Sequence, residues 1–480
     1  MINLLLLFPL VACFILFLFK NRILNNIMLN TYALVHFIIS GFLFFNIDLF
    51  PKWQTWKFFA IDDTNKLFLM LMSIVFLAVA LYNNGYLKND ISLTRKIRHY
   101  TYMIIFFIFS MTGAILSNNL GITWIFIEGT TLASAYLIYF HKTKHSIEAA
   151  WKYVFICSIG IALAFVGIIL LSISTGNLNS LFFTDLYSNA TAFNPFWLKL
   201  AFVFILFGIG TKMGLAPVHF WLPDAHAEAP SPISALLSAT LLNSAYLMIL
   251  NVFKIMVLAN CDSYARIMLY TMGFISLFIT AVFVYHINNY KRMLAYSSIE
   301  NMGILAIGTA LGGIGMFAAM IHLIGHSLIK ASFFLTSGNI LEIYGTKKIK
   351  SVRNLIKTDK NTAWLWLLSF LGIVAFPPSI LFISEFLIVK TMFIKGYFIM
   401  SALFLLLLTI ILYGLGKAVI KMTYSAQKDT KIESFETKKI KKLPLVMYLP
   451  QLLMLITAFV IGIYLPNGLL NYILLGIMGL

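Results

Sequence analysis

Apolar segments long enough to cross a lipid bilayer recur along the whole chain. A membrane-spanning helix needs about 20 consecutive, mainly apolar residues, because the hydrocarbon core of a bilayer is about 30 Å thick. Hydropathy predicts fourteen spans, at residues 3–19, 29–47, 67–86, 101–117, 120–140, 149–174, 197–215, 230–257, 264–287, 293–312, 314–341, 362–394, 396–423 and 446–478. We therefore expect an all-α polytopic membrane protein without a sizeable soluble domain.

Composition agrees with this class, since 61% of the 480 residues are hydrophobic and 11% are charged. Cys13, Cys157 and Cys261 lie far apart and form no CxxC pair. Neither a disulfide framework, an iron–sulfur site nor a zinc site is therefore expected, and we expect no cofactor in this chain.

The basic residues follow a pattern that predicts orientation. Most of them fall in the loops after odd-numbered spans: Lys20, Arg22, Lys88, Arg95, Lys96, Arg98, Lys142, Lys144, Lys291, Arg292, Lys347, Lys348, Lys350, Arg353, Lys357, Lys360, Lys428, Lys431, Lys438, Lys439, Lys441 and Lys442. Such loops face the cytoplasm, so both termini are expected on the outer side. Anionic lipid headgroups account for the net charge of +18, and nucleic-acid binding is not expected.

A few ionisable residues lie deep inside predicted spans, where a charge at a helix centre costs roughly 2.5 to 3.5 kcal/mol. They are Glu128, Lys212, His322, His326, Lys330 and Glu385. Groups of this kind normally face a protein interior or a watery cavity and mark an ion or proton path. The alternative is that they form structural ion pairs or satisfy breaks in helices.

Glu128 is the one charged residue from Leu116 through Phe140, so it needs a partner on another helix. Lys212 lies at a similar depth in its own span. An ion pair between them would stabilise both charges against desolvation, and moving a proton onto Glu128 would free Lys212 to release its own.

Three further groups share one face of a helix. His322, His326 and Lys330 follow each other at intervals of four residues, and an α-helix has 3.6 residues per turn. A lone buried histidine is usually a satisfied core residue. Two histidines with a lysine one turn on favour a proton relay, because imidazole titrates near neutral pH.

Two spans carry helix breakers at mid-membrane, namely Gly214 with Pro217, and Pro377 with Pro378. Paired broken helices predict an inverted-repeat transporter with its ion path at the breaks. We expect an N-terminal three-helix segment at 1–100, a first five-helix repeat at 101–258 (helices 4–8), a second at 259–424 (helices 9–13), and a cytoplasmic loop with helix 14 at 425–480. Helices 7 and 12 would be the broken members.

The loop after span seven is acidic and breaks the pattern of basic loops. It holds Asp224 and Glu228, which either form the mouth of the path or cap the next helix at Ser231 and Pro232. Capping is the simpler expectation.

Four motifs occur in a fixed order: KMGLAPVHFWLPDAHAEAPSPISALL, AYSSIENMG at 295–303, HSLIKASFFLTSGNI and PPSILFISEF. With them the chain resembles, from about Gly113 to Lys421, the antiporter-like membrane subunits of respiratory complex I, multisubunit sodium/proton antiporters and membrane-bound hydrogenases. EGTTLASAYLIYF and EAAWKYVFICSIGIA make it most similar to the hydrogenase-4 component F branch, found in formate hydrogenlyase-type complexes.

The resemblance implies roles for single residues. Glu128 matches the glutamate of the fifth span, which tunes the lysine matched by Lys212. His326 and Lys330 match the pair that links two half-channels, and Glu385 matches the acid that hands the proton outward. One position departs from several relatives, because Asn243 stands where they carry a lysine, and an amide cannot store a proton. Either water or His322 would have to bridge that gap.

The implied function is a proton-translocating, or sodium-translocating, subunit of an energy-conserving [NiFe]-hydrogenase complex in the bacterial cytoplasmic (inner) membrane, without a catalytic redox centre of its own. Partner subunits would hold the nickel–iron centre and iron–sulfur clusters on the cytoplasmic side. The basic loops at 347–360 and 428–442 are candidate contact surfaces or lipid-facing loops. The alternatives are a complex I antiporter-like subunit, a sodium/proton antiporter subunit, and a small-solute carrier or scaffold.

Overall fold

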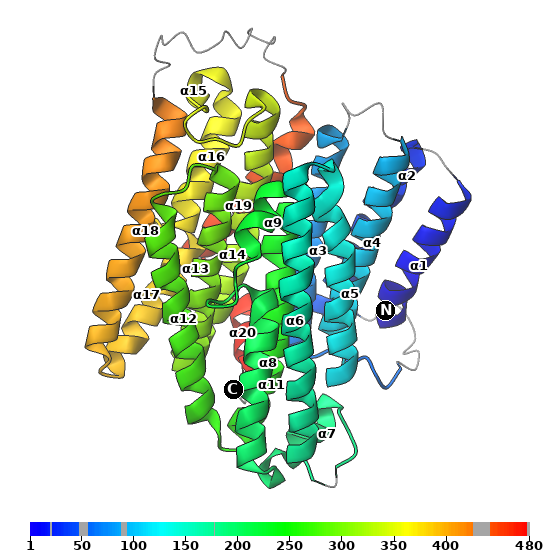
Figure 1. The fold of residues 1–480 in the computed structure, drawn as a ribbon, viewed down its shortest axis with the longest axis vertical. Helices are drawn as coiled ribbons and strands as arrows, with labels where there is room; N and C mark the ends of the chain where they lie inside the picture. Colours follow the sequence, from blue (N-terminus) through cyan, green and yellow to red (C-terminus); the bar gives the residue numbers. More distant parts are fainter. Residues whose placement is uncertain (20–21, 48–55, 88–93, 177, 426–441, 478–480) are drawn as a thin grey trace.

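The computed structural model describes residues 1–480 except 20–21, 48–55, 88–93, 177, 426–441 and 478–480. Helices stand side by side in one bundle, with the N-terminal helices on one flank and α16–α18 on the other (Figure 1). No β-strand occurs within the described ranges, so the predicted all-α class is confirmed. The helices of the first half are α1 (Ile2–Leu18), α2 (Arg22–Phe44), α3 (Asp63–Tyr86), α4 (Thr94–Leu116), α5 (Leu120–Ile138), α6 (Lys144–Ser174), α7 (Phe183–Asn189), α8 (Pro195–Met213), α9 (Leu222–Glu228), α10 (Ser231–Leu236) and α11 (Leu242–Leu258).

The second half continues with helices α12 (Asp262–Val284), α13 (Tyr290–Leu311), α14 (Ile314–Tyr344), α15 (Leu355–Thr358), α16 (Lys360–Ile373), α17 (Ile380–Ile394), α18 (Phe398–Tyr424), α19 (Leu449–Ile463) and α20 (Asn467–Ile477). Ten helices of the described chain are long and apolar enough to cross a membrane, and the count is eleven if α19 and α20, which are bent by 83° relative to each other, form one span. The remaining predicted spans coincide with α1, with α13, and with the short helices α16 and α17.

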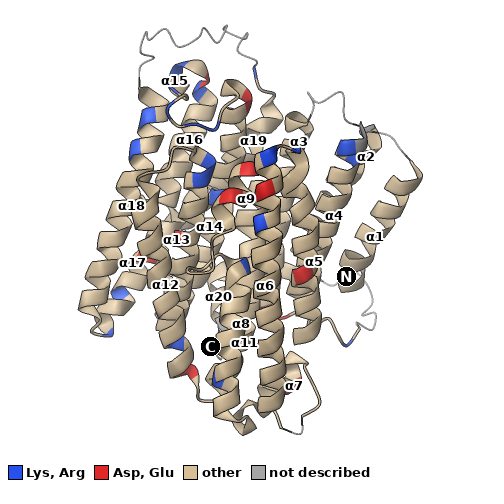
Figure 2. Ribbon diagram, viewed as in Figure 1, with Lys and Arg blue, Asp and Glu red and all other residues tan. Residues whose placement is uncertain are grey.

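Lysine and arginine gather at the end of the bundle that carries α15 (Figure 2). Several residues of the predicted basic loops lie outside the described residues, namely Lys20, Lys88, Lys428, Lys431, Lys438, Lys439 and Lys441, as do the side chains of Arg22 and Arg95. The candidate contact loop at 428–442 is therefore described only at Lys442, whereas the loop at 347–360 is described throughout.

Helix α8 ends one residue after Lys212, at Met213. Gly214 follows with φ of 78°, in the left-handed region that glycine adopts without steric cost, and a Cβ at this position would lie 2.4 Å from Cδ1 of Leu222. The chain then runs through a non-helical stretch that contains Pro217 before α9 begins at Leu222. Near the end of α8, the carbonyl of Thr211 accepts hydrogen bonds from the backbone N–H of Gly214 and from Nε1 of Trp221.

The second interruption lies between α16, which ends at Ile373, and α17, which begins at Ile380. Pro377 and Pro378 occupy this gap and supply no backbone N–H groups. A further irregularity, which hydropathy does not reveal, is a π-helical turn at Leu237–Leu241 between α10 and α11. Such turns are frequent at functional sites, and this one ends two residues before Asn243.

Helices α6 and α8 approach closely because glycines meet where they cross. An added Cβ at Gly208 would lie 2.5 Å from the backbone nitrogen of Ala164 and 2.6 Å from the carbonyl oxygen of Gly160. Small residues at such crossings let helix backbones pack tightly in a membrane. This packing holds the end of α8, and with it Lys212, against α6.

Replacing Gly208 with alanine should lower stability by about 1 to 3 kcal/mol, because the new methyl group meets backbone atoms that cannot move aside. The melting temperature of the detergent-solubilised protein measures this loss. Gly41→Ala on α2 is the matched control, since nothing lies within 4 Å of a Cβ there. Equal melting temperatures for the two variants would contradict the close α6–α8 crossing.

Candidate functional site

The six ionisable residues predicted within spans lie on four helices. Glu128 is on α5, Lys212 on α8, Glu385 on α17, and the other three are on α14: His322, His326 and Lys330. Lys212 and the three α14 residues are fully buried, whereas Glu128 and Glu385 are partly exposed.

Lys212 donates a hydrogen bond from Nζ to Oη of Tyr153 on α6, at 2.9 Å. The same ammonium lies 4.7 Å from the centre of the tyrosine ring, and Oη also bonds Oγ of Ser134 on α5, at 2.6 Å. Cation–π attraction and this hydrogen bond replace part of the hydration that the buried charge has lost. Tyr153 thus joins Lys212 to the helix that carries Glu128.

The predicted direct ion pair between Glu128 and Lys212 does not form in the described structure. Glu128 instead accepts a hydrogen bond at Oε2 from Oγ1 of Thr131, one turn along its own helix, at 3.0 Å. The Lys212 ammonium donates its hydrogen bond to Tyr153, and the partly exposed Glu128 carboxylate accepts one from the hydroxyl of Thr131. Nothing in the sequence marks Tyr153 as the intervening group, since one tyrosine among 22 carries no signal.

Asn243 on α11, the predicted gap, makes contacts that tie it to α14. Its Nδ2 donates to Oγ of Ser327 and to the carbonyl of Ala239, both at 2.7 Å. Ser327 directly follows His326, so the amide meets the α14 polar face through a hydroxyl and not through His322.

The three α14 groups make no hydrogen bonds to one another within the described structure, and two of them bond neighbouring helices. Lys330 donates from Nζ to the carbonyl of Leu294 on α13, at 2.7 Å. His322 bonds Oγ of Ser384 through Nδ1 at 2.9 Å and Oδ1 of Asn301 through Nε2 at 3.0 Å. Both ring nitrogens of His326 are buried without a hydrogen-bond partner among the described residues.

A further carboxylate was missed by sequence reasoning. Glu300 on α13 is 5% exposed and lines a cavity of about 270 Å³ together with Glu385. It stands within the predicted span 293–312, in the quoted motif AYSSIENMG, so an acidic residue inside an apolar segment was the available signal.

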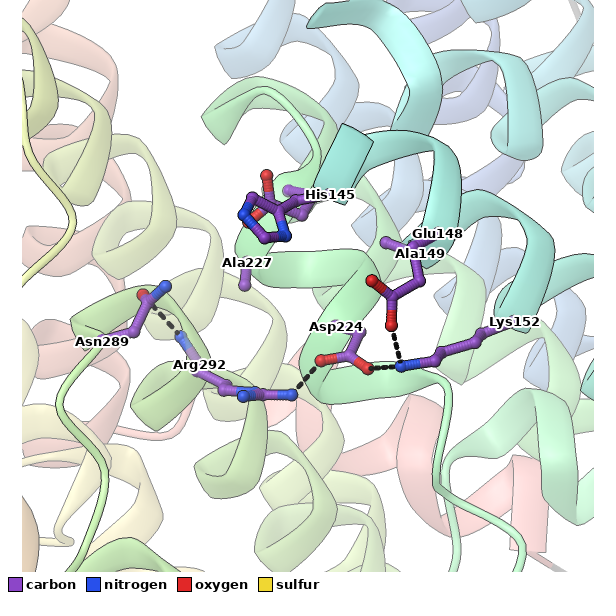
Figure 3. Close-up of a pocket in the computed structure, with 9 residues that line it drawn as sticks. His145, Glu148, Ala149, Lys152, Asp224, Ala227, Asn289 and Arg292 are labelled. Atoms are coloured by element: carbon purple, nitrogen blue, oxygen red, sulfur yellow. Dashed lines mark hydrogen bonds and ion pairs between the residues drawn. The ribbon is translucent and has the colours of Figure 1, made fainter. Parts of the chain in front are cut away.

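A charged pocket of about 220 Å³ lies where α6, α9 and the start of α13 meet (Figure 3). Asp224 forms ion pairs with Lys152 at 3.4 Å and with Arg292, and Glu228 pairs with Lys347 at 3.0 Å. The expectation that these two acids cap the next helix is wrong, although α10 does begin at Ser231, because that helix has no side-chain cap. The nearby lysines and arginine attract both carboxylates instead.

The sequence of the chain matches a known family and is similar to known proteins over nearly its whole length. The family described as NADH:quinone oxidoreductase/Mrp antiporter, TM, matches residues 117–411. The chain is 33% identical over 471 residues to the hydrogenase-4 component F homolog of Methylacidiphilum infernorum (isolate V4), covering 96% of this chain and 95% of that protein. It is 26% identical over 452 residues to a Na(+)/H(+) antiporter subunit of Bacillus subtilis (strain 168), covering 91% and 90%.

Two solved structures share the fold. A chain of the membrane-bound sulfane sulfur reductase, an archaeal respiratory membrane complex, gives a TM-score of 0.86 at 23% identity, covering 100% of this chain and 97% of that one. A chain of the Mrp complex from Dietzia sp. DQ12-45-1b gives 0.84 at 17% identity, covering 100% and 96%. No group of three or more His, Cys, Asp or Glu side chains in the described ranges could hold a metal ion. The family match over residues 117–411 and the relative that is 33% identical show that the chain belongs to the NADH:quinone oxidoreductase/Mrp antiporter family of membrane subunits.

Proposed function

We propose that this chain is the proton-translocating membrane subunit of an energy-conserving [NiFe]-hydrogenase complex, driven by redox chemistry in partner subunits. The observation that carries the proposal is the series of buried, hydrogen-bonded polar groups that includes Lys212, Asn243, Lys330 and His322. Glu385 follows Ser384, the residue that bonds His322. Such groups are costly in a membrane and serve ion or proton paths.

The hydrogenase assignment is supported by the hydrogenase-4 component F homolog, since the similarity extends over nearly the whole of both proteins. We infer that the partners include a hydrogenase subunit with a nickel–iron centre and iron–sulfur proteins. The described loop at 347–360 is a candidate surface for them, and its Lys347 already pairs with Glu228.

Proton transfer would begin at Lys212. With its ammonium held by Tyr153, a redox-driven change in the surrounding charges would release a proton from Nζ and leave a neutral amine. The negative charge of the partly exposed Glu128 stabilises the Lys212 ammonium, and protonation of Glu128 removes that charge. Asn243 cannot carry a proton, so water at its unpartnered Oδ1 would have to pass the proton to the α14 face. Lys330 and then Glu385 would complete the route.

We infer that the chain contains fourteen spans in two inverted repeats, residues 101–258 and 259–424, between an N-terminal segment at 1–100 and a C-terminal part at 425–480. The two interruptions, after α8 and between α16 and α17, support this symmetry. The gathering of basic residues at the α15 end supports a cytoplasmic position for that end in the bacterial inner membrane, with both termini outside.

A sodium/proton antiporter subunit is the second candidate, because similarity to the Bacillus subtilis antiporter protein also covers about nine tenths of both chains. The same carboxylates and lysines would serve a sodium-coupled cycle. The two candidates differ in their partners, since an antiporter needs no redox subunit.

Purification of the tagged chain from mild detergent tests the proposal. We expect stoichiometric co-purification of subunits that contain nickel and iron and that evolve or oxidise hydrogen. A complex that oxidises NADH without nickel would indicate the complex I alternative, and a complex without redox metals would favour the antiporter. Either of the last two results would contradict the hydrogenase assignment.

A further inference from the structure

Glu300 on α13 shares a cavity with Glu385 on α17. The walls of this cavity are mainly apolar and include Val374 and Ala375 at the helix interruption, Phe386 on α17 and Leu405 and Leu412 on α18. Phe386, Leu405 and Leu412 are also 58%, 46% and 47% exposed on the outer surface of the bundle. The two carboxylates therefore line a mainly apolar cavity that adjoins the outer surface of the bundle at α17 and α18.

Glu300 itself lacks a full set of partners. Only 5% of the residue is exposed, and Oε2 has no hydrogen-bond partner among the described residues. A buried carboxylate with an unpartnered oxygen is expensive unless a proton, a cation or water satisfies it. The structure thus offers a position for a ligand of positive charge.

The residues next to the two carboxylates hold the same histidine. Asn301, which follows Glu300, accepts at Oδ1 from Nε2 of His322, while Ser384, which precedes Glu385, bonds Nδ1. His322 thereby fixes α13 and α17 relative to each other, with both of its ring nitrogens already engaged. This arrangement gives His322 a positioning role and leaves the carboxylates as the groups facing the cavity.

Lys330 on α14 is bonded to the helix that carries Glu300. Its Nζ is anchored on the carbonyl of Leu294, on the same helix as Glu300, and the opposite charges of Lys330 and Glu300 attract each other. Glu300 and Glu385 in turn interact through their like charges. Glu300 is therefore electrically coupled to both of its neighbours on the proposed route.

We propose that Glu300 and Glu385 form a two-carboxylate site that binds one proton, and that Glu300 receives this proton from Lys330. The inference rests on the proposed function. In the transfer, an N–H bond of the Lys330 ammonium breaks and an O–H bond forms on Glu300, leaving a neutral amine and a neutral acid. Water held between the two carboxylates then carries the proton to Glu385, because their oxygens supply the polar partners that a water needs and the cavity of about 270 Å³ has room for it. Two carboxylates that face one apolar cavity share one proton because both cannot remain charged there.

The test compares Glu300→Gln, Glu385→Gln and the double variant in inverted vesicles that carry the assembled complex. Each single variant should lower proton uptake per electron at least about tenfold, as for loss of a group that carries the proton. The double variant should be no worse than the singles, because the two groups act as one site. Glu300→Asp, which keeps a carboxyl group, should restore part of the uptake, and Asp262→Asn on the surface should leave it unchanged.

Lys212→Ala is measured alongside to separate this inference from the proposed function. Loss of uptake in Lys212→Ala with native uptake in Glu300→Gln would overturn the role of Glu300 alone. Native uptake in both variants would overturn the proposed function as well. A Glu300→Gln defect seen only when sodium is present would replace the shared proton with a sodium ion and overturn the proton site.

Carbodiimide labelling provides a readout that a structural role would not produce. Dicyclohexylcarbodiimide partitions into lipid and modifies protonated carboxyl groups in apolar surroundings. We expect mass spectrometry of the native complex to find the adduct on Glu300 or Glu385, together with loss of proton uptake. Absence of the adduct from both residues would contradict a protonated pair that is reached from the lipid side.

Discussion

Replacing Lys212 with alanine should abolish redox-driven proton uptake while leaving the complex assembled. The ammonium is fully buried, and its direct partner in the described structure is the hydroxyl of Tyr153. Removing it takes away the group that holds the proton at the end of α8, where no other described side chain can replace it. We expect uptake per electron to fall at least about tenfold, the effect typical of losing a proton carrier.

Tyr153→Phe is the informative companion to this variant. It keeps the ring that faces the ammonium but removes the hydroxyl that bonds Lys212 and Ser134. We expect a smaller loss of uptake than in Lys212→Ala, because the charge remains. Uptake would be measured from quenching of a pH-sensitive dye in inverted vesicles, with subunit content determined by gel electrophoresis. Native uptake in Lys212→Ala would make the lysine a structural group.

Replacing Lys330 with alanine should have an effect of similar size in the second half of the route. Lys330 is fully buried, donates to the carbonyl of Leu294 and is attracted by the Glu300 carboxylate, so its loss interrupts transfer toward Glu385. A loss of at least about tenfold in uptake per electron is again expected. Lys330→Arg should not restore it, because guanidinium does not release its proton in a protein.

Lys417→Ala is the matched control for Lys330→Ala. Lys417 is an exposed lysine on α18 that bonds Oη of Tyr285, away from the buried route. It should leave uptake per electron unchanged. Equal losses in both lysine variants would point to a general effect of lysine removal on assembly and would contradict a specific role for Lys330.

The sequence allowed the helical class and most of the polar residues to be predicted, for a simple physical reason. Hydrocarbon cannot solvate charges or free backbone groups, so a lysine, histidine or glutamate deep inside an apolar segment stands out. Lys212 and Lys330 are conspicuous in this way, and the structure buries both completely. Glycine and proline predict the two helix interruptions, because glycine permits a left-handed backbone and proline cannot continue a helix.

What could not be predicted is how side chains on different helices meet. The expected Glu128–Lys212 contact is replaced by Tyr153 and Thr131, because hydroxyl groups supplied by packing are nearer than the opposite charge. Glu300 and Glu385 share a cavity because α13 and α17 line it together. The π-helical turn at Leu237–Leu241 likewise has no period in the sequence that distinguishes it from an α-helix.

The most direct test of ion translocation by this chain is simultaneous measurement of proton and sodium uptake by vesicles that carry the complex. A pH-sensitive dye and radioactive sodium would be followed together with electron flux, in native protein and in Lys212→Ala. We expect proton uptake that scales with electron flux, persists without sodium and is lost in Lys212→Ala. Sodium accumulation that depends on Lys212, or electron flow with equal proton uptake in both proteins, would contradict a proton path through Lys212.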